Sequence, residues 1–326
     1  FSENSVKTAQ QSTTKQISGG AIYSPVVSIS GCKQPISFLS NSASTSAETP
    51  TSDATKKDSF GGAIGATTSI TLSDNSSITF SKNYAEMGGA IGCYNSETNG
   101  NGNGNGKVTI SNNNLIRFDG NSSLKRGGAI YAGTLEIPNG NVTFQNNTSK
   151  YDGSAIYCTK SATITAGSTI LFLGNQVTTA STVAENGGGS GNTSINNLGA
   201  AIYGANGSSD VPITLKALSG DIIFKDNQCT ANGNTKYCSI AGNVQLDLKA
   251  TTGRTIAFYD AVNISTKNSQ TQNLDINKAE NGTTYEGTVL FSGEYHENKS
   301  FIPQKVTLHN GTLVLGENAE LNVISF

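Results

Sequence analysis

The sequence contains no Trp, one Met and two His among 326 residues, and only 13% of its residues are charged. Lys and Arg number 21 against 23 Asp and Glu, so no excess of positive charge is present to bind nucleic acid or an anionic membrane surface. No run of about 18 apolar residues occurs, so we expect no transmembrane helix. The opening residues FSENSVKTAQ lack the basic and then apolar pattern of a signal peptide.

Gly, by contrast, accounts for 37 residues, and Asn, Ser and Thr are also frequent. These residue types disfavour helix interiors, so the composition excludes a mainly helical protein. Ile, Val, Leu and Phe recur along the whole chain, which excludes general disorder. Length alone suggests two domains, although a single large β-architecture also fits.

Two short motifs recur and alternate along the chain. One is Phe-x-x-Asn, and the other is Gly-Gly-Ala-Ile, with altered copies at 153–156 (GSAI) and 199–202 (GAAI). The first motif supplies Phe1 with Asn4, Phe38 with Asn41, Phe80 with Asn83, Phe118 with Asn121, Phe144 with Asn147, Phe172 with Asn175 and Phe224 with Asn227. The second supplies Gly19, Gly20, Ala21 and Ile22, then Gly61, Gly62, Ala63 and Ile64, then Gly88, Gly89, Ala90 and Ile91, then Gly127, Gly128, Ala129 and Ile130. Strict alternation indicates an internal repeat, and because the chain begins within it we expect a fragment of a longer protein.

Each repeat is 21 to 23 residues long where no insertion interrupts it. A typical unit has an alternating run at 69–72, a turn at 73–77 and a second alternating run at 78–80. Such alternation, with β-branched residues and with Asn, Gly and Ser at the ends, predicts short half-buried strands. We expect inserted flexible loops near 42–60, 96–106 and 176–198, where polar residues and Gly dominate.

A unit of this size cannot bury its apolar face alone, but stacked units can. The sequence therefore predicts an all-β fold, a parallel β-helix in which each unit forms one coil and coils rise by about 4.8 Å. The crossover rule for parallel strands makes the helix right-handed. We expect β-helix passenger coils with the GGAI and FxxN repeats over 1–270, where the pattern decays after Asn227, and degenerate C-terminal β-helix coils over 271–326.

Both motifs are expected to serve mainly the fold. Stacking would align the motif Phe residues into an interior ladder, and each motif Asn would take the αL conformation at a corner and join a ladder of amides. The Gly pair would supply positive φ and close backbone approach. A less favoured interpretation is that motif atoms touch a partner directly. The residues after the glycine motif are expected to be exposed, either as contacts or as ordinary strand residues: Tyr23, Tyr131, Tyr157 and Tyr203.

Repeated GGA(I/L/V) alternating with FxxN resembles the polymorphic membrane proteins of chlamydiae, over residues 1–260 and again in the closing stretch 288–326. Members of that family are autotransporters, exported by a signal peptide and anchored by a C-terminal outer-membrane β-barrel, with an adhesive passenger displayed outside. The resemblance implies that this chain is passenger alone. It would lie at the outer-membrane surface or be secreted, and would meet the membrane only through a barrel domain that this chain lacks.

The function implied by the resemblance is attachment to host cells through a host cell-surface receptor protein. Two alternatives remain open: a structural or antigenically variable surface protein without a defined receptor, and a glycan-active β-helix enzyme. The enzyme is disfavoured because the carboxylates are scattered, and neither His296 nor His309 has a Ser or Cys partner at a recognisable spacing. Because CxxC, HExxH and calcium-binding nonapeptide motifs are missing, we expect no metal and no cofactor.

The five cysteines are an odd number, which suggests an unpaired thiol or an intermolecular bond. Cys93 and Cys158 follow the glycine motif at the same offset but two coils apart, about 9.5 Å, which is beyond the reach of a disulfide. Cys229 and Cys238 flank a short polar stretch and form the one plausible intrachain disulfide. The resemblance implies a cysteine-bonded outer envelope. In such an envelope Cys32, Cys93 and Cys158 would be available for intermolecular links or homo-oligomers.

Overall fold

The computed structural model describes residues 1–7, 18–44, 58–94, 106–178, 199–205, 209–231, 234–265 and 273–325. In these residues the chain forms 27 β-strands and no helix, so none of them provides a helix able to cross a membrane. The predicted all-β fold is confirmed. Most of each expected insertion, at 45–57, 95–105 and 179–198, lies outside the described residues.

The strands stack in three columns. The first holds the strands that follow the glycine motif or its equivalents: β2 (Ile22–Ser30), β5 (Ile64–Ser73), β8 (Ile91–Cys93), β9 (Lys107–Ser111), β12 (Ile130–Gln145), β14 (Ile156–Leu173), β16 (Ile202–Gly204), β17 (Val211–Ala217), β20 (Asn234–Ala250), β22 (Ala261–Ser265), β23 (Asn273–Ile276), β25 (Asn298–Leu308) and β27 (Ala319–Ser325). The second holds the strands that carry the motif Phe or its equivalent, and the ends of β12 and β14 continue it: β3 (Ile36–Leu39), β6 (Ile78–Ser81), β10 (Ile116–Asp119), β18 (Ile222–Lys225), β21 (Thr255–Phe258), β24 (Thr288–Phe291) and β26 (Thr312–Leu315). The third follows the motif Asn: β1 (Ser5–Lys7), β4 (Ser42–Ser44), β7 (Tyr84–Met87), β11 (Ser122–Arg126), β13 (Thr148–Ser149), β15 (Gln176–Val177) and β19 (Gln228–Ala231).

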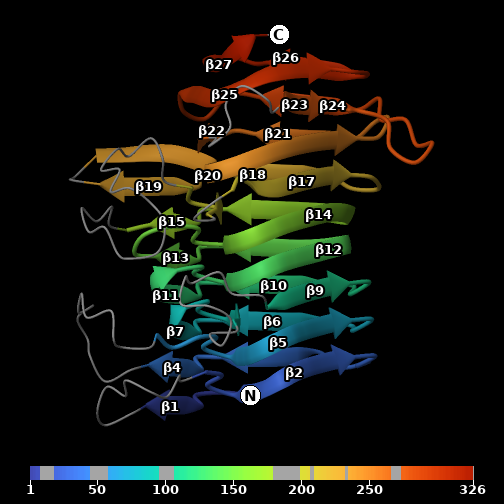
Figure 1. The fold of residues 1–326 in the computed structure, drawn as a ribbon. Helices are drawn as coiled ribbons and strands as arrows, with labels where there is room; N and C mark the ends of the chain where they lie inside the picture. Colours follow the sequence, from blue (N-terminus) through green and yellow to red (C-terminus); the bar gives the residue numbers. More distant parts are fainter. Residues whose placement is uncertain are drawn as a thin grey trace.

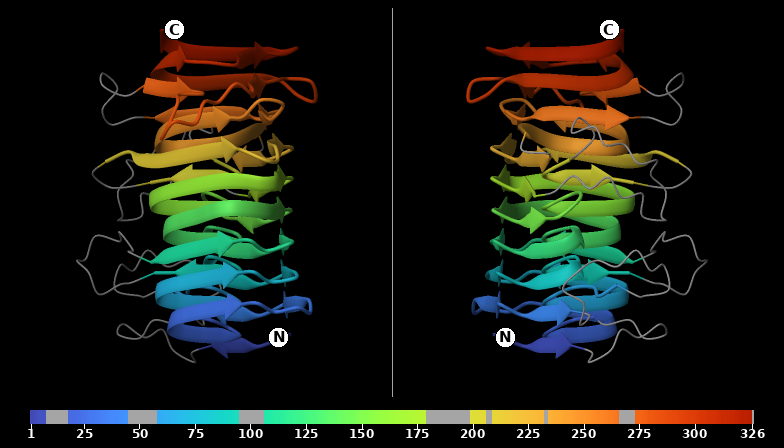
Figure 2. Two further views of the ribbon diagram at one scale, coloured as in Figure 1. Left: turned by 90° about the vertical axis from the view of Figure 1, so that its right-hand side faces the viewer. Right: turned by 90° about the vertical axis from the view of Figure 1, so that its left-hand side faces the viewer.

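Neighbouring coils pair in parallel, with like motif residues directly opposite each other. Phe118 pairs with Phe80 on one side and Phe144 on the other, and Ile130 pairs with Ile91 and Ile156. Figures 1 and 2 show the coils rising in chain order from the N-terminus to the C-terminus. The architecture is the expected parallel β-helix.

The core lies inside the coils, because alternate residues of each strand point inward. In β6, Ile78 and Phe80 are buried while Thr79 and Ser81 are half-buried. This inward set forms one continuous cluster along the whole stack, which has no gap between the motif-bearing coils and the degenerate ones. The period-2 pattern read from the sequence therefore corresponds to the inside and outside of the solenoid.

The edges of two expected insertions differ slightly from the sequence-based boundaries. Ser42–Ser44 forms β4 and pairs with β1 and β7, so the chain leaves the coil later than residue 42. Gly106 belongs to the coil, because its carbonyl accepts hydrogen bonds from the backbone N–H groups of Gly133 at 2.9 Å and Thr134 at 3.0 Å.

One ladder within the described residues breaks the parallel rule. β19 and the start of β20 form an antiparallel pair, with Gln228 opposite Tyr237. From Cys238 onward β20 rejoins the stack, and Ile240 takes the position of the motif Ile beside Ile202. Above this point the coils continue through the pairs β21 with β24 and β22 with β25.

Candidate functional site

The motif Phe residues form the interior ladder that their spacing predicted. From Phe38 to Phe291, ring centroids of neighbouring coils lie 4.5 to 5.0 Å apart, and every ring is fully buried. The ladder continues past the last Phe-x-x-Asn copy because Phe258 and Phe291 occupy the same register. Only Phe1, at the open end of the stack, is exposed among the motif Phe residues described. In the folded stack, the rings from Phe38 onward contact one another and present no surface to a partner.

From Asn41 onward, the motif Asn residues are buried in a ladder of amide hydrogen bonds. Each side-chain oxygen accepts the backbone N–H of the preceding motif Asn at 2.9 to 3.2 Å and its Nδ2 at 2.8 to 3.0 Å. From Asn83 to Asn227 each Nδ2 also donates to a Phe carbonyl of the preceding coil. The expectation of αL geometry at the Asn itself was wrong: positive φ falls one residue earlier, as at Lys82, Gly120 and Asn146. The Asn can thereby stay extended and aim its amide along the stack.

The two glycines of the motif have different tasks. The first takes a positive φ of 66° to 67° at Gly19, Gly61, Gly88 and Gly127, which disfavours any other residue. The second has no such φ, but a Cβ on Gly128 would lie 2.3 Å from the carbonyl oxygen of Ser154 in the next coil. The first Gly is therefore required for its backbone conformation, and the second because a side chain would clash with the next coil. The Ala and Ile that follow the Gly pair are fully buried in three copies of the motif: Ala63 and Ile64, Ala90 and Ile91, and Ala129 and Ile130.

Of the Tyr residues that follow the glycine motif, only Tyr23, at the N-terminal end of the stack, is exposed as expected. Tyr23 is 55% exposed, whereas Tyr131 and Tyr157 are 4% exposed and Tyr203 is half-buried. Their rings stack on one another at 5.2 and 5.6 Å, and the guanidinium of Arg126 lies 5.3 Å above the Tyr157 ring. Burial raises the pKa of Tyr131 well above its usual value. These Tyr residues are a second packing column rather than a contact surface.

The cysteines divide into buried and accessible thiols. Cys93 and Cys158 both pair with Ala132, one on each side, so they lie two coils apart as expected. Both are fully buried, and burial raises the pKa of each thiol to about 12. The expectation that they are available for intermolecular disulfides is wrong for the folded chain, because neither thiol reaches the surface. Cys32 is partly exposed.

Cys229 and Cys238 lie side by side at the base of the antiparallel pair. Both are fully buried with Val177 and Ala200. Burial, followed by the hydrogen bond that the Cys229 thiol makes with Cys238, raises the pKa of Cys229 well above its usual value. The intrachain disulfide between these two residues remains a prediction.

The ladder of Asn amides ends at Asp260, whose carboxylate accepts the hydrogen bonds that the next motif Asn would accept. Its Oδ2 accepts the backbone N–H of Asn227 at 2.9 Å and Asn227 Nδ2 at 2.7 Å, and its Oδ1 lies 2.8 Å from His296 Nε2. Burial raises the pKa of the Asp260 carboxyl, and the hydrogen bonds from His296 and Asn227 partly offset this effect. His296 also stacks on Tyr237 with 3.6 Å between ring centroids.

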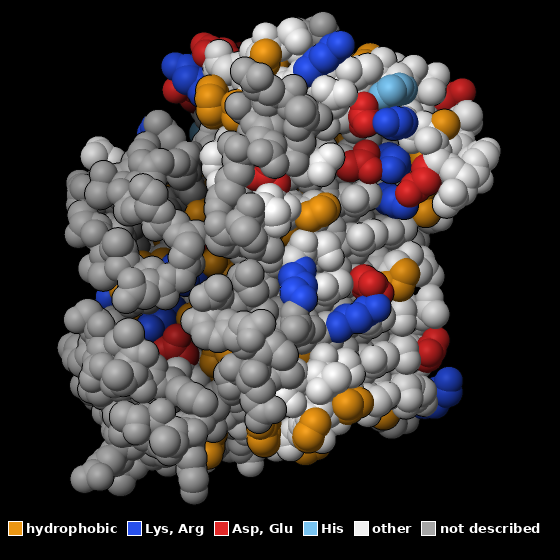
Figure 3. All heavy atoms as spheres, viewed as in Figure 1, with side chains coloured by type: hydrophobic (Ala, Val, Ile, Leu, Met, Phe, Trp, Pro, Cys, Tyr) orange, Lys and Arg blue, Asp and Glu red, His pale blue; other side chains and the backbone are white. Residues whose placement is uncertain are grey.

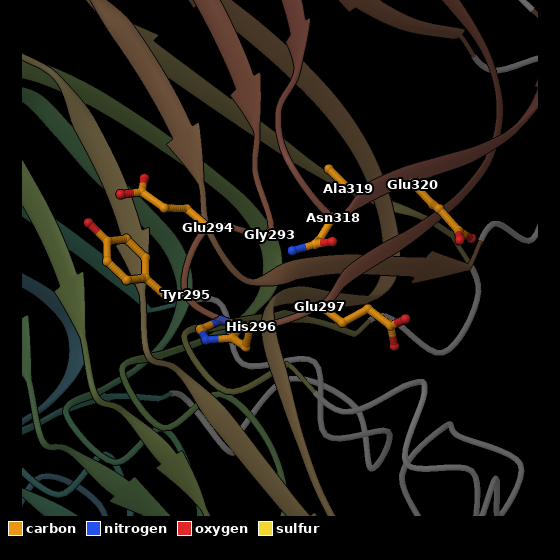
Figure 4. A pocket seen from close by; sticks show the side chains of 8 residues that line it. All are labelled: Gly293, Glu294, Tyr295, His296, Glu297, Asn318, Ala319 and Glu320. Atoms are coloured by element: carbon orange, nitrogen blue, oxygen red, sulfur yellow. The ribbon is translucent and has the colours of Figure 1, made fainter.

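A surface pocket of about 450 Å³ opens beside this carboxyl and imidazole. Its walls come from the connection between β24 and β25 and from the start of β27: Gly293, Glu294, Tyr295, His296, Glu297, Asn318, Ala319 and Glu320. Figure 4 shows Tyr295 and Glu294 on one side of the opening, Glu297 and Glu320 on the other, and Asn318 between them. This pocket in the degenerate coils is a candidate binding site that the sequence motifs did not indicate.

Charged side chains elsewhere on the C-terminal coils pair with one another. Lys216 and Lys249, adjacent in register, both contact Glu280, and Lys249 also contacts Asp247 at 2.6 Å. Figure 3 shows charges of both signs together in the upper part of this face. Across the described residues, His, Cys, Asp and Glu side chains form no group of three that could hold a metal ion.

Comparison with known proteins identifies the repeat. The model of the Chlamydia polymorphic membrane protein repeat matches residues 115–133 and 141–159. The probable outer membrane protein PmpB of Chlamydia muridarum is 49% identical over 336 residues, covering 100% of this chain and 19% of that protein. The chain belongs to the chlamydial polymorphic membrane protein family. The probable outer membrane protein pmp20 of Chlamydia pneumoniae is 52% identical over 306 residues, covering 93% of this chain and 17% of that protein.

This chain therefore spans about a fifth of the length of the curated polymorphic membrane proteins that it matches. No solved structure gives a significant match. The repeat model of the family covers the coils in which Phe118 and Phe144 stack and ends before the pocket-bearing coils. The family repeat thus coincides with the regular interior of the solenoid, and the pocket lies where that repeat has decayed.

Proposed function

We propose that this chain is part of the displayed passenger of an autotransporter and that it attaches the bacterium to host cells. Localisation at the outer membrane or cell surface follows from the family and from relatives named probable outer membrane proteins. The attachment role is supported by the division of labour in the solenoid. The Phe, Asn and Gly residues of the motifs build the interior and the corners of the coils. The side chains that point outward can therefore change without loss of the fold.

The observation that carries the proposal is the combination of a stacked scaffold with a surface pocket and an exposed aromatic side chain at that pocket. Tyr295 at the pocket is 49% exposed. Exposed Tyr residues on a rigid support are common among the energetically dominant residues of binding interfaces. A host cell-surface receptor protein or a glycan attached to one is the class of partner that this surface suits.

The direct test is competition. The folded soluble chain, added in excess, should bind host cells saturably and reduce attachment of bacteria that carry it. A chain that binds cells without saturation and leaves attachment unchanged would favour the alternative of a structural or antigenically variable surface protein. A screen for cleavage of host glycans tests the enzymatic alternative separately, since neither adhesion nor antigenic variation predicts products.

A further inference from the structure

The pocket forms because the chain leaves the coil between two strands that otherwise belong to the regular stack. β24 ends at Phe291, whose ring is the last in the interior ladder, and β25 begins at Asn298. The five residues between Ser292 and Asn298 form one wall, and Asn318 to Glu320 of the next coil form the other. Backbone hydrogen bonds hold the walls together, from Gly293 N–H to the Glu317 carbonyl and from Asn298 N–H to the Asn318 carbonyl at 3.1 Å.

The base of the pocket is fixed by the end of the amide ladder. His296 lines the pocket, and its Nε2 is held 2.8 Å from the buried Oδ1 of Asp260. Asp260 is itself held by two donors from Asn227, and the imidazole is packed against the ring of Tyr237. A side chain with these contacts loses little further freedom when a ligand binds, which favours affinity.

Tyr295 supplies an aromatic platform at the mouth. The ammonium of Lys225 lies 3.3 Å from the centre of its ring, and the ring of Tyr259 meets it edge to face at 5.1 Å. These two contacts hold the ring in place while it remains 49% exposed. Lys225 lies over one face of this ring, so the C–H face of a sugar ring would stack on the opposite face.

Polar groups surround this platform. Glu294 lies beside Tyr295, Glu297 and Glu320 lie across the opening, and the amide of Asn318 stands between them (Figure 4). Carboxylate oxygens accept hydrogen bonds from adjacent hydroxyl groups, and an amide both donates and accepts. Lys299 pairs with Glu297 at 2.6 Å and Lys225 lies over Tyr295, so three carboxylates face two ammonium groups. The remaining negative charge disfavours sialylated and sulfated sugars.

We propose that this pocket binds a neutral saccharide of a host-cell glycan, stacked on Tyr295 and hydrogen-bonded through its hydroxyls to Glu294, Asn318 and Glu320. The biological role of this saccharide site rests on the proposed attachment function. The pocket is open to solvent, so single saccharides bind weakly and attachment depends on many displayed copies.

The test is titration of the folded chain with soluble neutral oligosaccharides, N-acetyllactosamine and lacto-N-tetraose, beside 3′-sialyllactose and heparin. Tyr295→Ala should weaken binding of the neutral sugars about tenfold, the loss typical of one interface anchor. Tyr295→Phe keeps the ring and should stay within about threefold of wild type. Tyr23→Ala removes a Tyr of similar exposure at the opposite end of the solenoid and should change nothing.

Three results would overturn the proposal: no saturable binding of either neutral sugar by folded wild type, equal weakening by Tyr23→Ala and Tyr295→Ala, or a preference for heparin or 3′-sialyllactose. Binding of oligolysine that Glu294→Gln or Glu320→Gln abolishes, without sugar binding, would show a site for basic peptides instead. Sugar binding is measured without cells, so its outcome is independent of the competition assay. A chain that blocks attachment yet binds no sugar retains the proposed function and loses this inference.

Discussion

The motif-bearing coils from Gly61 to Asn227 and the degenerate coils above them share one interior but differ at their surface. In the lower coils each corner repeats, with a Phe, an amide and a Gly pair or its altered copy in the same place. In the upper coils the Phe column persists through Phe258 and Phe291, while Asp260 replaces the Asn. The pocket lined by Tyr295 and His296 lies in the upper part of the stack. The comparison teaches that strict repetition builds a scaffold, and that relaxed repetition leaves room for a site.

The largest difference between the two regions is expected from removal of one ring. Phe118→Ala should cost about 3–5 kcal/mol of unfolding free energy, because the ring is fully buried and stacks at 4.9 Å on both sides. Phe291→Ala should cost about 1 kcal/mol less, since Phe291 stacks on Phe258 alone and the residue above it is the exposed Leu315. Urea melts of the two variants give the comparison, and equal costs would mean that ring stacking adds nothing to burial.

A smaller and pH-dependent difference is expected at the end of the amide ladder. Because the pKa of Asp260 is raised in the folded state, the native chain binds more protons than the unfolded chain above pH about 4. The contribution of Asp260 to stability therefore falls as pH rises from the unfolded pKa to the folded one. The Asp260→Asn variant has no carboxyl to ionise at this position and continues the ladder of amides. The stability of the variant relative to wild type should therefore increase as pH rises from the unfolded pKa of Asp260 to its folded pKa.

Denaturant melts of wild type and Asp260→Asn at closely spaced pH values between 3.5 and 7 check this expectation. Asp119→Asn removes the same charge from a half-buried position in a motif-bearing coil and corrects for net charge. A difference that stays constant with pH, or that decreases as pH rises, would contradict the raised pKa of Asp260.

The smallest effect is expected from shortening the Asn-Gly insertion. Deletion of residues 99–104 removes no apolar side chain and should change the melting temperature by no more than about 2 °C. Extending the deletion through Gly106 should lower it clearly, because Gly106 holds the N–H groups of Gly133 and Thr134. Differential scanning calorimetry of both deletions provides the measurement, and equal melting temperatures would show that Gly106 is dispensable.

The interior of this fold could be predicted from the sequence because the same two motifs recur in the same order in each coil. Stacking of the coils then places Phe on Phe and Asn on Asn, whatever the outer residues and the length of the insertions are. The burial of Tyr131 and Tyr157 could not be predicted in the same way, since it depends on Phe60, Met87 and Arg126 outside the motif. A second amide pair, Asn75 with Asn113, was also missed, because it lies in turns without a shared motif.

The pocket was beyond motif-based prediction for a related reason. His296, Tyr295 and Asn318 come from connections that occur once, so no second copy exists to reveal their register. One signal was present in the sequence: Phe258-Tyr-Asp-Ala has Ala261 where Phe-x-x-Asn has Asn, with an acidic residue, Asp260, directly before it. A lost motif residue inside an otherwise continuous ladder marks the coil where the surface changes.

The central claim is that the family motif supports binding through the fold and is not itself the contact. Its most direct test pairs a melting curve with a host-cell binding titration for Gly128→Val. The Val side chain would overlap the Ser154 carbonyl of the next coil, which a Cβ approaches to 2.3 Å. We predict that binding falls only in proportion to the fraction of chain unfolded. A Gly128→Val chain that keeps the wild-type melting curve yet no longer binds cells would contradict the account.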